Sequence, residues 1–287
     1  MGIIFATLAL LSWGLGDFLI QKSTRKFGNW VALFYITAFA AVTLFPFVYK
    51  ELAGLLTASR DSGLLLVAGA MVFLAGMLDF QALKVGNISV VEPIYALEVP
   101  ITALLAFLLV KERLTWPQVA LIASSLVGIL LVSTHSFRGP KKIDLEKGVW
   151  YALLAALGMG VVNLLFGMGS RDTSPLLINW FTSFFVALVT LAYLAANRRL
   201  AGIVRSWREH KVLILAVSLV DNMAWVAYSY SALYIPIAVA TSISESYIAL
   251  AAILGMVFNK ESLKRHQWAG LCLAVVSVVV LARTTGN

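Results

Sequence analysis

The amino-acid sequence predicts an all-α membrane protein whose ten transmembrane helices form two inverted repeats of five. Three observations carry this prediction: the composition, the length of the apolar runs and an internal duplication. Hydrophobic residues make up 61% of the 287 residues and charged residues only 13%. A soluble domain averages about 25% charged residues, and a chain of this size must still cover roughly a quarter of its unfolded surface with polar groups. The composition therefore excludes a soluble protein.

The apolar runs give the number of helices, because about 20 helical residues cross a bilayer. Ten runs reach this length, at 2–21, 29–49, 62–84, 87–110, 115–135, 148–168, 175–196, 211–233, 235–259 and 267–283. They are too long for barrel strands and lack alternating polar residues, so helices are expected. The polar stretch Ser136–Lys147 divides the chain into a first repeat over 1–137, a linker over 138–147 and a second repeat over 148–287.

A recurring motif predicts that the two halves arose by duplication. Lys-Glu-x-Leu-x-x-x-Gln follows the fourth run at Lys111–Gln118 and the ninth run at Lys260–Gln267. Two shorter pairs recur in register with it: Asn29-Trp30 with Asn179-Trp180, and Ala82-Leu83 with Ala232-Leu233. Because each half has an odd number of spans, the second half must enter the membrane inverted, an arrangement that recurs in transporters.

These features resemble a known family. Trp13-Gly14 in the first run, the Ala-Leu endings and the two Lys-Glu-x-Leu-x-x-x-Gln corners are similar to the EamA-like family of the drug/metabolite transporter superfamily. The resemblance covers nearly the whole chain and implies a polytopic exporter or importer of small metabolites. Members of the family transport amino acids, drugs, and nucleotide-linked or phosphorylated metabolites. In the related small multidrug transporters, a carboxylate in the first helix exchanges protons for cationic drugs, and Asp17 is the nearest position here.

Acidic residues lie within the expected spans, where Lys84 is the only nearby cation: Asp17, Asp79, Glu92, Glu98, Asp221 and Glu245. A charge at the bilayer centre costs roughly 2.5–3.5 kcal/mol, so these groups should face a cavity or be neutralised. Protonation, a cationic substrate or both would supply the neutralising charge. For Asp17 and Asp79, which lie near the ends of their runs, capping of a helix end is an equally good interpretation.

The fourth run is the most informative. It reads Glu92-Pro93-Ile94-Tyr95-Ala96-Leu97-Glu98-Val99-Pro100. Proline has no backbone N–H, so the carbonyls of Ser89 and Ala96 are expected to lack their usual donors. Such a defect is tolerated where a helix lines a cavity. Tyr95 lies one turn from both Glu92 and Glu98, which predicts that the three contribute to one lining.

The eighth run adds Asp221-Asn222, with Trp225 one turn further on. An aromatic ring beside a carboxylate can hold an organic cation, although aromatic residues also gather at membrane interfaces. The small hydroxyl residues around Glu245, and Trp13 with its neighbouring glycines, are more typical of helix packing. Asn163 is a polar residue for which the sequence favours neither interpretation.

The patterns together predict a secondary transporter that exports a small metabolite, amino acid or organic cation by alternating access, with proton coupling as an option. An intramembrane enzyme and a channel-like membrane subunit are the alternatives. The sequence contains no H-E-x-x-H, G-x-S-x-G or P-loop motif, so enzymatic or ATP-driven activity is not expected. The single Cys272 excludes an intrachain disulfide and a thiolate metal cluster, and no cofactor or metal is expected.

The net charge of +8 is spread in short clusters between the runs, which suits anionic lipid headgroups better than nucleic acid. The expected partners are a small-molecule substrate, membrane lipid and, with coupling, protons. The protein is expected in the plasma membrane, as in the inner membrane of a prokaryote. A monomer is expected, and a dimer is the alternative. Most Lys and Arg lie in odd-numbered loops, including Arg198-Arg199, which places those loops in the cytoplasm and both termini outside. The resemblance favours cytoplasmic termini instead.

Overall fold

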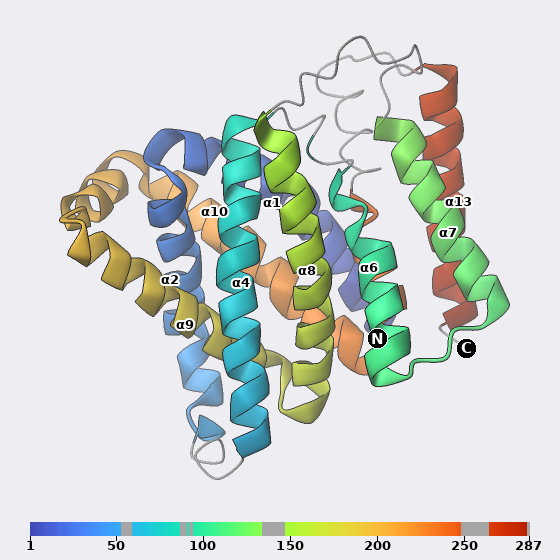
Figure 1. The fold of residues 1–287 in the computed structure, drawn as a ribbon, viewed down its shortest axis with the longest axis horizontal. Helices are drawn as coiled ribbons and strands as arrows, with labels where there is room; N and C mark the ends of the chain where they lie inside the picture. The colour runs from blue at the N-terminus through green and yellow to red at the C-terminus, as the bar shows by residue number, and fades with distance from the viewer. Residues whose placement is uncertain (53–58, 87–90, 92–93, 134–146, 248–263, 286–287) are drawn as a thin grey trace.

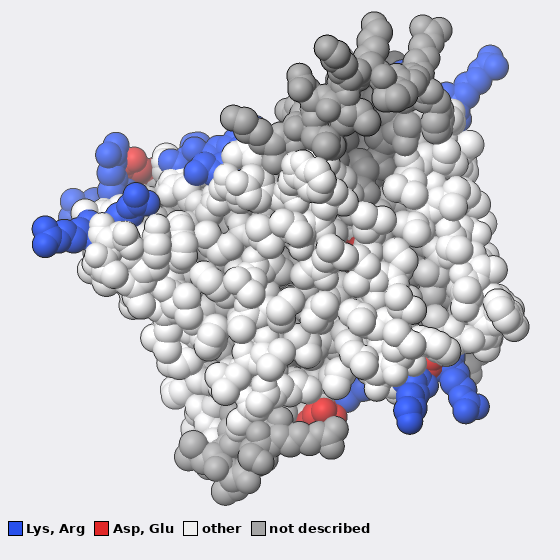
Figure 2. Space-filling view, viewed as in Figure 1, with Lys and Arg blue, Asp and Glu red and all other residues white. Residues whose placement is uncertain are grey.

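The computed structural model describes residues 1–52, 59–86, 91, 94–133, 147–247 and 264–285. Every regular element in these residues is a helix (Figure 1), as the sequence predicts. Figure 2 shows Lys and Arg side chains gathered at two ends of the molecule, with a wide band between them almost free of charge. Large apolar side chains are exposed on the long helices, among them Leu66, Leu157 and Leu219. An uncharged belt between charged ends is the surface that a bilayer requires.

Within the described residues, six helices are long and apolar enough to cross a membrane. They are α1 (Gly2–Phe27), α2 (Asn29–Val48), α4 (Ser59–Val85), α8 (Lys147–Asp172), α9 (Pro175–Ala196) and α10 (Leu200–Tyr234). Each coincides with an expected span, but α10 begins well before its span at 211–233. Its backbone leaves helical geometry at His210 (φ −135°, ψ 25°). The charged part before the kink was not predicted, because Arg205, Arg208 and Glu209 interrupt the apolar run.

Apolar helices that do not meet this combination of length and composition occupy parts of the remaining expected spans. They are α6 (Glu98–Leu105), which continues into the π-helical turn η1 (Ala106–Val110), α7 (Trp116–Ser133), α11 (Ile237–Ser244) and α13 (Arg265–Thr285). Parts of the expected fourth and ninth spans lie outside the described residues.

The fourth and ninth spans are both interrupted instead of continuous. The chain turns at 96–97 before α6 begins, and it turns again at 245–246 after α11 ends. The Ala96 carbonyl lacks its usual donor at Pro100, but the Val99 N–H replaces that donor at 3.3 Å. The turn tightens the backbone and replaces the bond that Pro100 cannot make. Ser89 lies outside the described residues.

The helices pack in pairs across the two halves of the chain. α1 packs against α10, α4 against α8, α2 against α9 and α7 against α13, so each pair joins a helix before residue 134 to one after residue 146. The interrupted spans follow the same rule, since α11 packs on α1, α6 packs on α8, and α6 and α11 touch each other. The core is therefore an interface between the two halves.

The recurring sequence motif has a structural role in both halves. Gln118 accepts a hydrogen bond from the Thr115 N–H, and Gln267 accepts one from the Lys264 N–H, each at 2.9 Å. These side chains satisfy backbone donors at the starts of α7 and α13, which have no partner within the helix. The glutamines of the motif are thus helix caps.

A substitution at the α7–α13 crossing should weaken the fold. A Cβ atom at Gly128 would lie 2.6 Å from the Ala274 nitrogen and 2.7 Å from the Gly270 carbonyl oxygen. Since the backbone cannot yield cheaply, we expect Gly128→Ala to lower the free energy of unfolding by about 1–3 kcal/mol. Thermal unfolding in detergent measures this. Gly63→Ala is the matched control, because nothing lies within 4 Å of its added Cβ. Equal stability of the two variants would contradict the close crossing.

Candidate functional site

A cavity of about 100 Å³ lies at the interface of the two halves. It is lined by five carboxylates from different helices: Asp17, Asp79, Glu98, Asp221 and Glu245. No Lys, Arg or His is found among the described residues that line it. Tyr95, Asn222 and Trp225 line the same cavity. Eight of the nine residues that the sequence singled out therefore meet in one place, and the ninth, Glu92, lies outside the described residues.

Glu98 is the first residue of α6, directly after the break in the fourth span. Its side chain is buried, and its Oε2 accepts a hydrogen bond from Nδ2 of Asn163 at 3.2 Å. Asn163 comes from α8, and its backbone carbonyl accepts a hydrogen bond from Tyr228 Oη on α10 at 3.0 Å. An acid of the first half is thus held by a chain of polar groups from the second half.

Glu245 lies at the corresponding break in the ninth span. It caps the C-terminal end of α11 and is 4% exposed. The carbonyl end of a helix carries partial negative charge, which adds to that of an ionised carboxylate and favours a cation beside it. The neighbouring hydroxyls bond to their own helix, with Thr241 Oγ1 donating to Ile237 O at 2.9 Å and Ser246 Oγ donating to Ser242 O at 2.7 Å. Ser242 Oγ also lies 3.2 Å from Ser125 Oγ on α7, and Thr241 Oγ1 lies 2.8 Å from Tyr228 Oη on α10, so these hydroxyls contribute to packing between helices.

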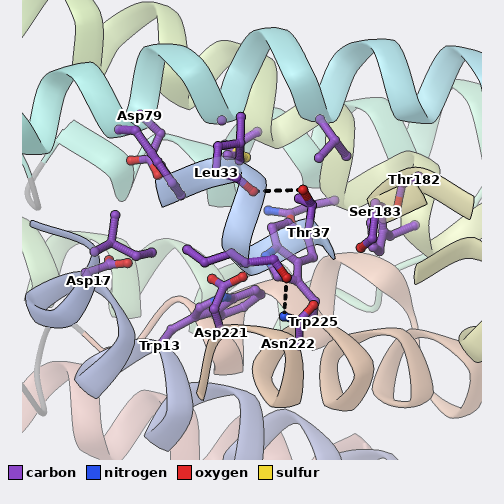
Figure 3. A pocket seen from close by; sticks show the side chains of 18 of the residues that line it. Trp13, Asp17, Leu33, Thr37, Asp79, Thr182, Ser183, Asp221, Asn222 and Trp225 are labelled. Carbon is purple, nitrogen blue, oxygen red and sulfur yellow. Dashed lines mark hydrogen bonds between the residues drawn. The ribbon is translucent and has the colours of Figure 1, made fainter. Parts of the chain in front are cut away.

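Asp17, Asp79 and Asp221 project from α1, α4 and α10 toward the same space (Figure 3). Asp221 is buried, and the other two are half-buried. Capping of helix ends, the alternative for Asp17 and Asp79, is wrong. α1 continues to Phe27 and α4 to Val85, so both acids lie inside their helices. α1 extends beyond its expected run through a last turn that contains Arg25 and Lys26, whereas α4 ends one residue beyond its expected run.

Aromatic rings form one wall of the cavity. The Trp13 and Trp225 rings meet edge to face, with centroids 5.1 Å apart, and Phe166 lies 4.7 Å from Trp225. Trp13, expected to serve packing, therefore does both: it packs against Trp225 and faces the cavity. Tyr95 Oη donates to the Asp79 backbone carbonyl at 3.3 Å. The wall offers π faces beside carboxylates, which suits an organic cation.

Asn222 presents an acceptor to the cavity. Its Nδ2 donates to the backbone carbonyls of Ile36 at 2.9 Å and Ser218 at 2.7 Å, the first of which ties α10 to α2. Both amide hydrogens are used in this way, so Oδ1 is the group left to meet a bound solute. The amide therefore adds to the preference for a positively charged or hydrogen-donating cargo.

The model of the EamA-like transporter family matches residues 1–134 and 146–283. The chain belongs to this family. It is a multi-pass membrane transporter, and similar proteins include an "Uncharacterized transporter" of Archaeoglobus fulgidus, 23% identical over 283 residues, with 97% of each chain covered. A protein of Haemophilus influenzae is 22% identical over 287 residues, covering 97% of this chain and 96% of its own.

Two further matches concern length and fold. A protein of Methanocaldococcus jannaschii is 26% identical over 133 residues, which cover 95% of that protein but only 46% of this chain. A solved structure described as "Crystal structure of protein" aligns with a TM-score of 0.74 and 14% identity, covering 99% of this chain and 98% of the other. At that identity the likeness shows the fold alone.

Several residues that line the cavity of this EamA-like transporter were not predicted. They include Thr37, Asn163, Phe166, Asn179, Thr182, Ser183 and Tyr247. The signal available in the sequence was a polar side chain within an apolar run, as at Asn163 and Asn179, which are 1% and 4% exposed. Acids carry this signal strongly because a buried charge is costly, whereas amides and hydroxyls are common within membrane helices.

At the end of the transporter where the chain begins, a polar network joins the two halves. Glu112, after η1, accepts from Arg171 Nη2 and from the Ile237 N–H, both at 2.9 Å. Arg171 also donates to the carbonyls of Ala232 at 2.9 Å and Ile235 at 3.0 Å. In the first half, Arg25 holds the end of α4 in the same way, with Nη2 donating to Gly86 O at 2.9 Å. The Glu112–Arg171 network joins the two halves at this end of the molecule.

Proposed function

We propose that this EamA-like transporter exports a small organic cation or amino acid in exchange for protons, by alternating access at the central cavity. The observation that supports this most is the lining: five carboxylates, with no Lys, Arg or His among the described residues. A cluster of buried acids is costly unless positive charge neutralises it. Either a bound proton or a bound cation meets that need. Because both would occupy the same carboxylates, binding of one displaces the other, which gives antiport.

The direction of transport follows from the competition between cargo and protons for the same carboxylates. Where protons are driven inward across the plasma membrane of a prokaryote, a cargo that exchanges for them moves outward. The cavity of about 100 Å³ has room for several water molecules and is smaller than the roughly 300–1,000 Å³ of typical ligand sites. A small metabolite or amino acid suits this size better than a large drug.

Alternating access requires two similar halves, and we propose ten spans in two inverted repeats over 1–137 and 148–287, joined by the linker 138–147. The two segments matched by the family model support this division, as does the M. jannaschii relative, nearly all of which matches less than half of this chain. In this division α1 corresponds to α8, and α10 corresponds to α4. The pair α1–α10 therefore corresponds to the pair α8–α4, and the helices of each pair pack against each other. The breaks at 96–97 and 245–246 correspond in the same way.

The interrupted spans explain why the site would bind ions. Discontinuous helices near the middle of a transporter offer charged helix ends and unbonded backbone groups to substrates. Glu98 begins one half-helix and Glu245 follows the other, so each acid lies where its helix is broken. We propose that these two acids bind the cargo and protons, with Trp225 and Trp13 covering the cargo. A monomer without a cofactor, catalysis or a nucleic-acid partner suffices for this mechanism.

Counterflow in proteoliposomes tests the proposal. Vesicles with purified protein are loaded with an unlabelled small cation or amino acid, and uptake of the labelled compound is followed across a panel. A carrier gives transient accumulation of label above equilibrium for at least one compound. Equilibration without accumulation would instead indicate a channel, and chemical conversion of the compound would indicate an enzyme.

A further inference from the structure

A second cavity differs from the central one in charge. It has a volume of about 580 Å³ and lies where the end of α4, the start of α2 and the α9–α10 connection meet. Lys84, Arg198 and Arg199 line it with exposed side chains, and no acid is among its described lining residues. None of the three forms an ion pair within the described part of the chain. Figure 2 shows basic side chains gathered at this end of the molecule. We call this hollow the basic cavity.

The start of α2 adds donors to the basic cavity. Residues 28–31 line it, and the first bond of this turn runs from the Ala32 N–H to the Gly28 carbonyl. The N–H groups before Ala32 have no carbonyl within their own helix and lie at its positive end, an arrangement that binds phosphate in many proteins. Gly28 has φ of +84°, a conformation that glycine adopts without strain and that lets the chain turn sharply from α1. The side chain of Asn29 is not counted among these donors, because its Nδ2 donates to Gln81 Oε1 at 2.7 Å and its Oδ1 is an acceptor.

Beside the basic cavity lies an amphipathic helix, the part of α10 before the His210 kink. Leu200, Val204 and Trp207 project from one face and are 44%, 54% and 43% exposed. Tyr35 fixes this segment to α2, because its hydroxyl donates to the Ile203 carbonyl at 2.6 Å. Its remaining positions include Arg205 and Arg208. A short helix with exposed apolar residues on one face and basic residues elsewhere is typical of a segment that lies in the membrane interface.

We propose that the basic cavity binds the headgroup of an acidic phospholipid. Lys84, Arg198 and Arg199 would hold the phosphate together with the start of α2, and the acyl chains would run beside Leu200 and Val204. The occupant is a lipid, not a soluble anion, because the cations adjoin apolar surface that membrane chains would cover. Basic pockets between membrane helices recognise anionic headgroups in this manner, and each Lys or Arg near the surface contributes about 1 kcal/mol.

The test is a titration of purified protein in neutral detergent with a short-chain phosphatidylglycerol. The unfolding temperature of the protein is measured at each lipid concentration. We expect saturable stabilisation of the wild type and an apparent Kd about thirtyfold weaker for the Arg198→Gln/Arg199→Gln variant, since two contacts are lost. Arg113→Gln/Arg283→Gln removes the same charge from exposed residues outside the basic cavity and should leave the Kd unchanged. If the first variant does not fold, Lys84→Gln replaces it, with a weakening of about fivefold expected.

Short-chain phosphatidylcholine and inorganic phosphate distinguish the sources of any effect. Phosphatidylcholine should give no saturable stabilisation, and phosphate should give none at matched ionic strength. If phosphate stabilised the protein as much as phosphatidylglycerol, the occupant of the basic cavity would be a soluble anion, and the proposal of a lipid would be overturned. Equal weakening in the two double variants would show a general charge effect and overturn the site, as would no response of the wild type to phosphatidylglycerol.

Discussion

Replacing Glu98 with Gln is expected to lower the initial rate of counterflow about tenfold or more, with little change in the amount of folded protein. Gln keeps the size of the side chain and can still accept a hydrogen bond from Asn163. It cannot carry the negative charge that would bind a cation or a proton. A hydrogen bond to a charged group contributes about 1.5–3 kcal/mol, and 1.4 kcal/mol corresponds to tenfold in binding. Uptake into proteoliposomes at matched protein content measures the effect.

Glu51→Gln is the control for this prediction. Glu51 is exposed, and its Oε2 accepts a hydrogen bond from Ser174 outside the central cavity. The exchange of charge for amide is identical, so counterflow should stay near the wild-type rate. Wild-type transport by Glu98→Gln would show that the Glu98 charge is not needed, and equal loss in the two variants would point to a general effect of removing acids.

Replacing Glu112 with Ala is expected to lower the free energy of unfolding by about 2–3 kcal/mol. Glu112 joins Arg171 and the start of α11, and its side chain is 10% exposed. Its removal leaves a partly buried guanidinium without its carboxylate and takes an acceptor from the Ile237 N–H, and hydrogen bonds to charged groups contribute about 1.5–3 kcal/mol each. Solvent around Arg171, whose side chain is 30% exposed, keeps the loss below that of a fully buried pair. Equilibrium unfolding in detergent measures the change.

Glu209→Ala is the matched comparison. Glu209 also pairs with an arginine at 2.9 Å, but the side chains of Arg205 and Glu209 are 78% and 49% exposed. An exposed pair of this kind contributes about 0.3–0.5 kcal/mol. Similar destabilisation by the two variants would mean that the Glu112–Arg171 network does not fasten the two halves together.

The central cavity was largely predictable because charge within the membrane is rare and costly. Asp79, Glu98, Asp221 and Glu245 stood out in apolar runs, and the structure brings them together from four different elements. That these acids lie close together could not be predicted, because they are far apart in the sequence and their proximity depends on the packing of one half against the other. The recurring motif, by contrast, predicts a duplication, and in the structure its glutamines cap helices.

Features that depend on backbone geometry or on neutral polar groups could not be predicted from the sequence. The Ala96 carbonyl accepts a hydrogen bond from the Val99 N–H because the chain tightens into a turn. The position of Pro100 in the sequence predicts the lost bond but not this replacement. Asn163 holds Glu98 from the other half, yet an amide in an apolar run costs too little to stand out. The amphipathic start of α10 was hidden because its charged residues separate it from the apolar run that follows.

Proton movement during transport tests the central claim most directly. Proteoliposomes that contain a pH-sensitive dye receive a transported cation from outside, with no initial pH difference. If cation and proton compete for the same carboxylates, cation entry releases protons outward, so the interior becomes more alkaline, and Glu98→Gln removes this signal. Uptake of the cation by the wild type without any change in internal pH would contradict the account.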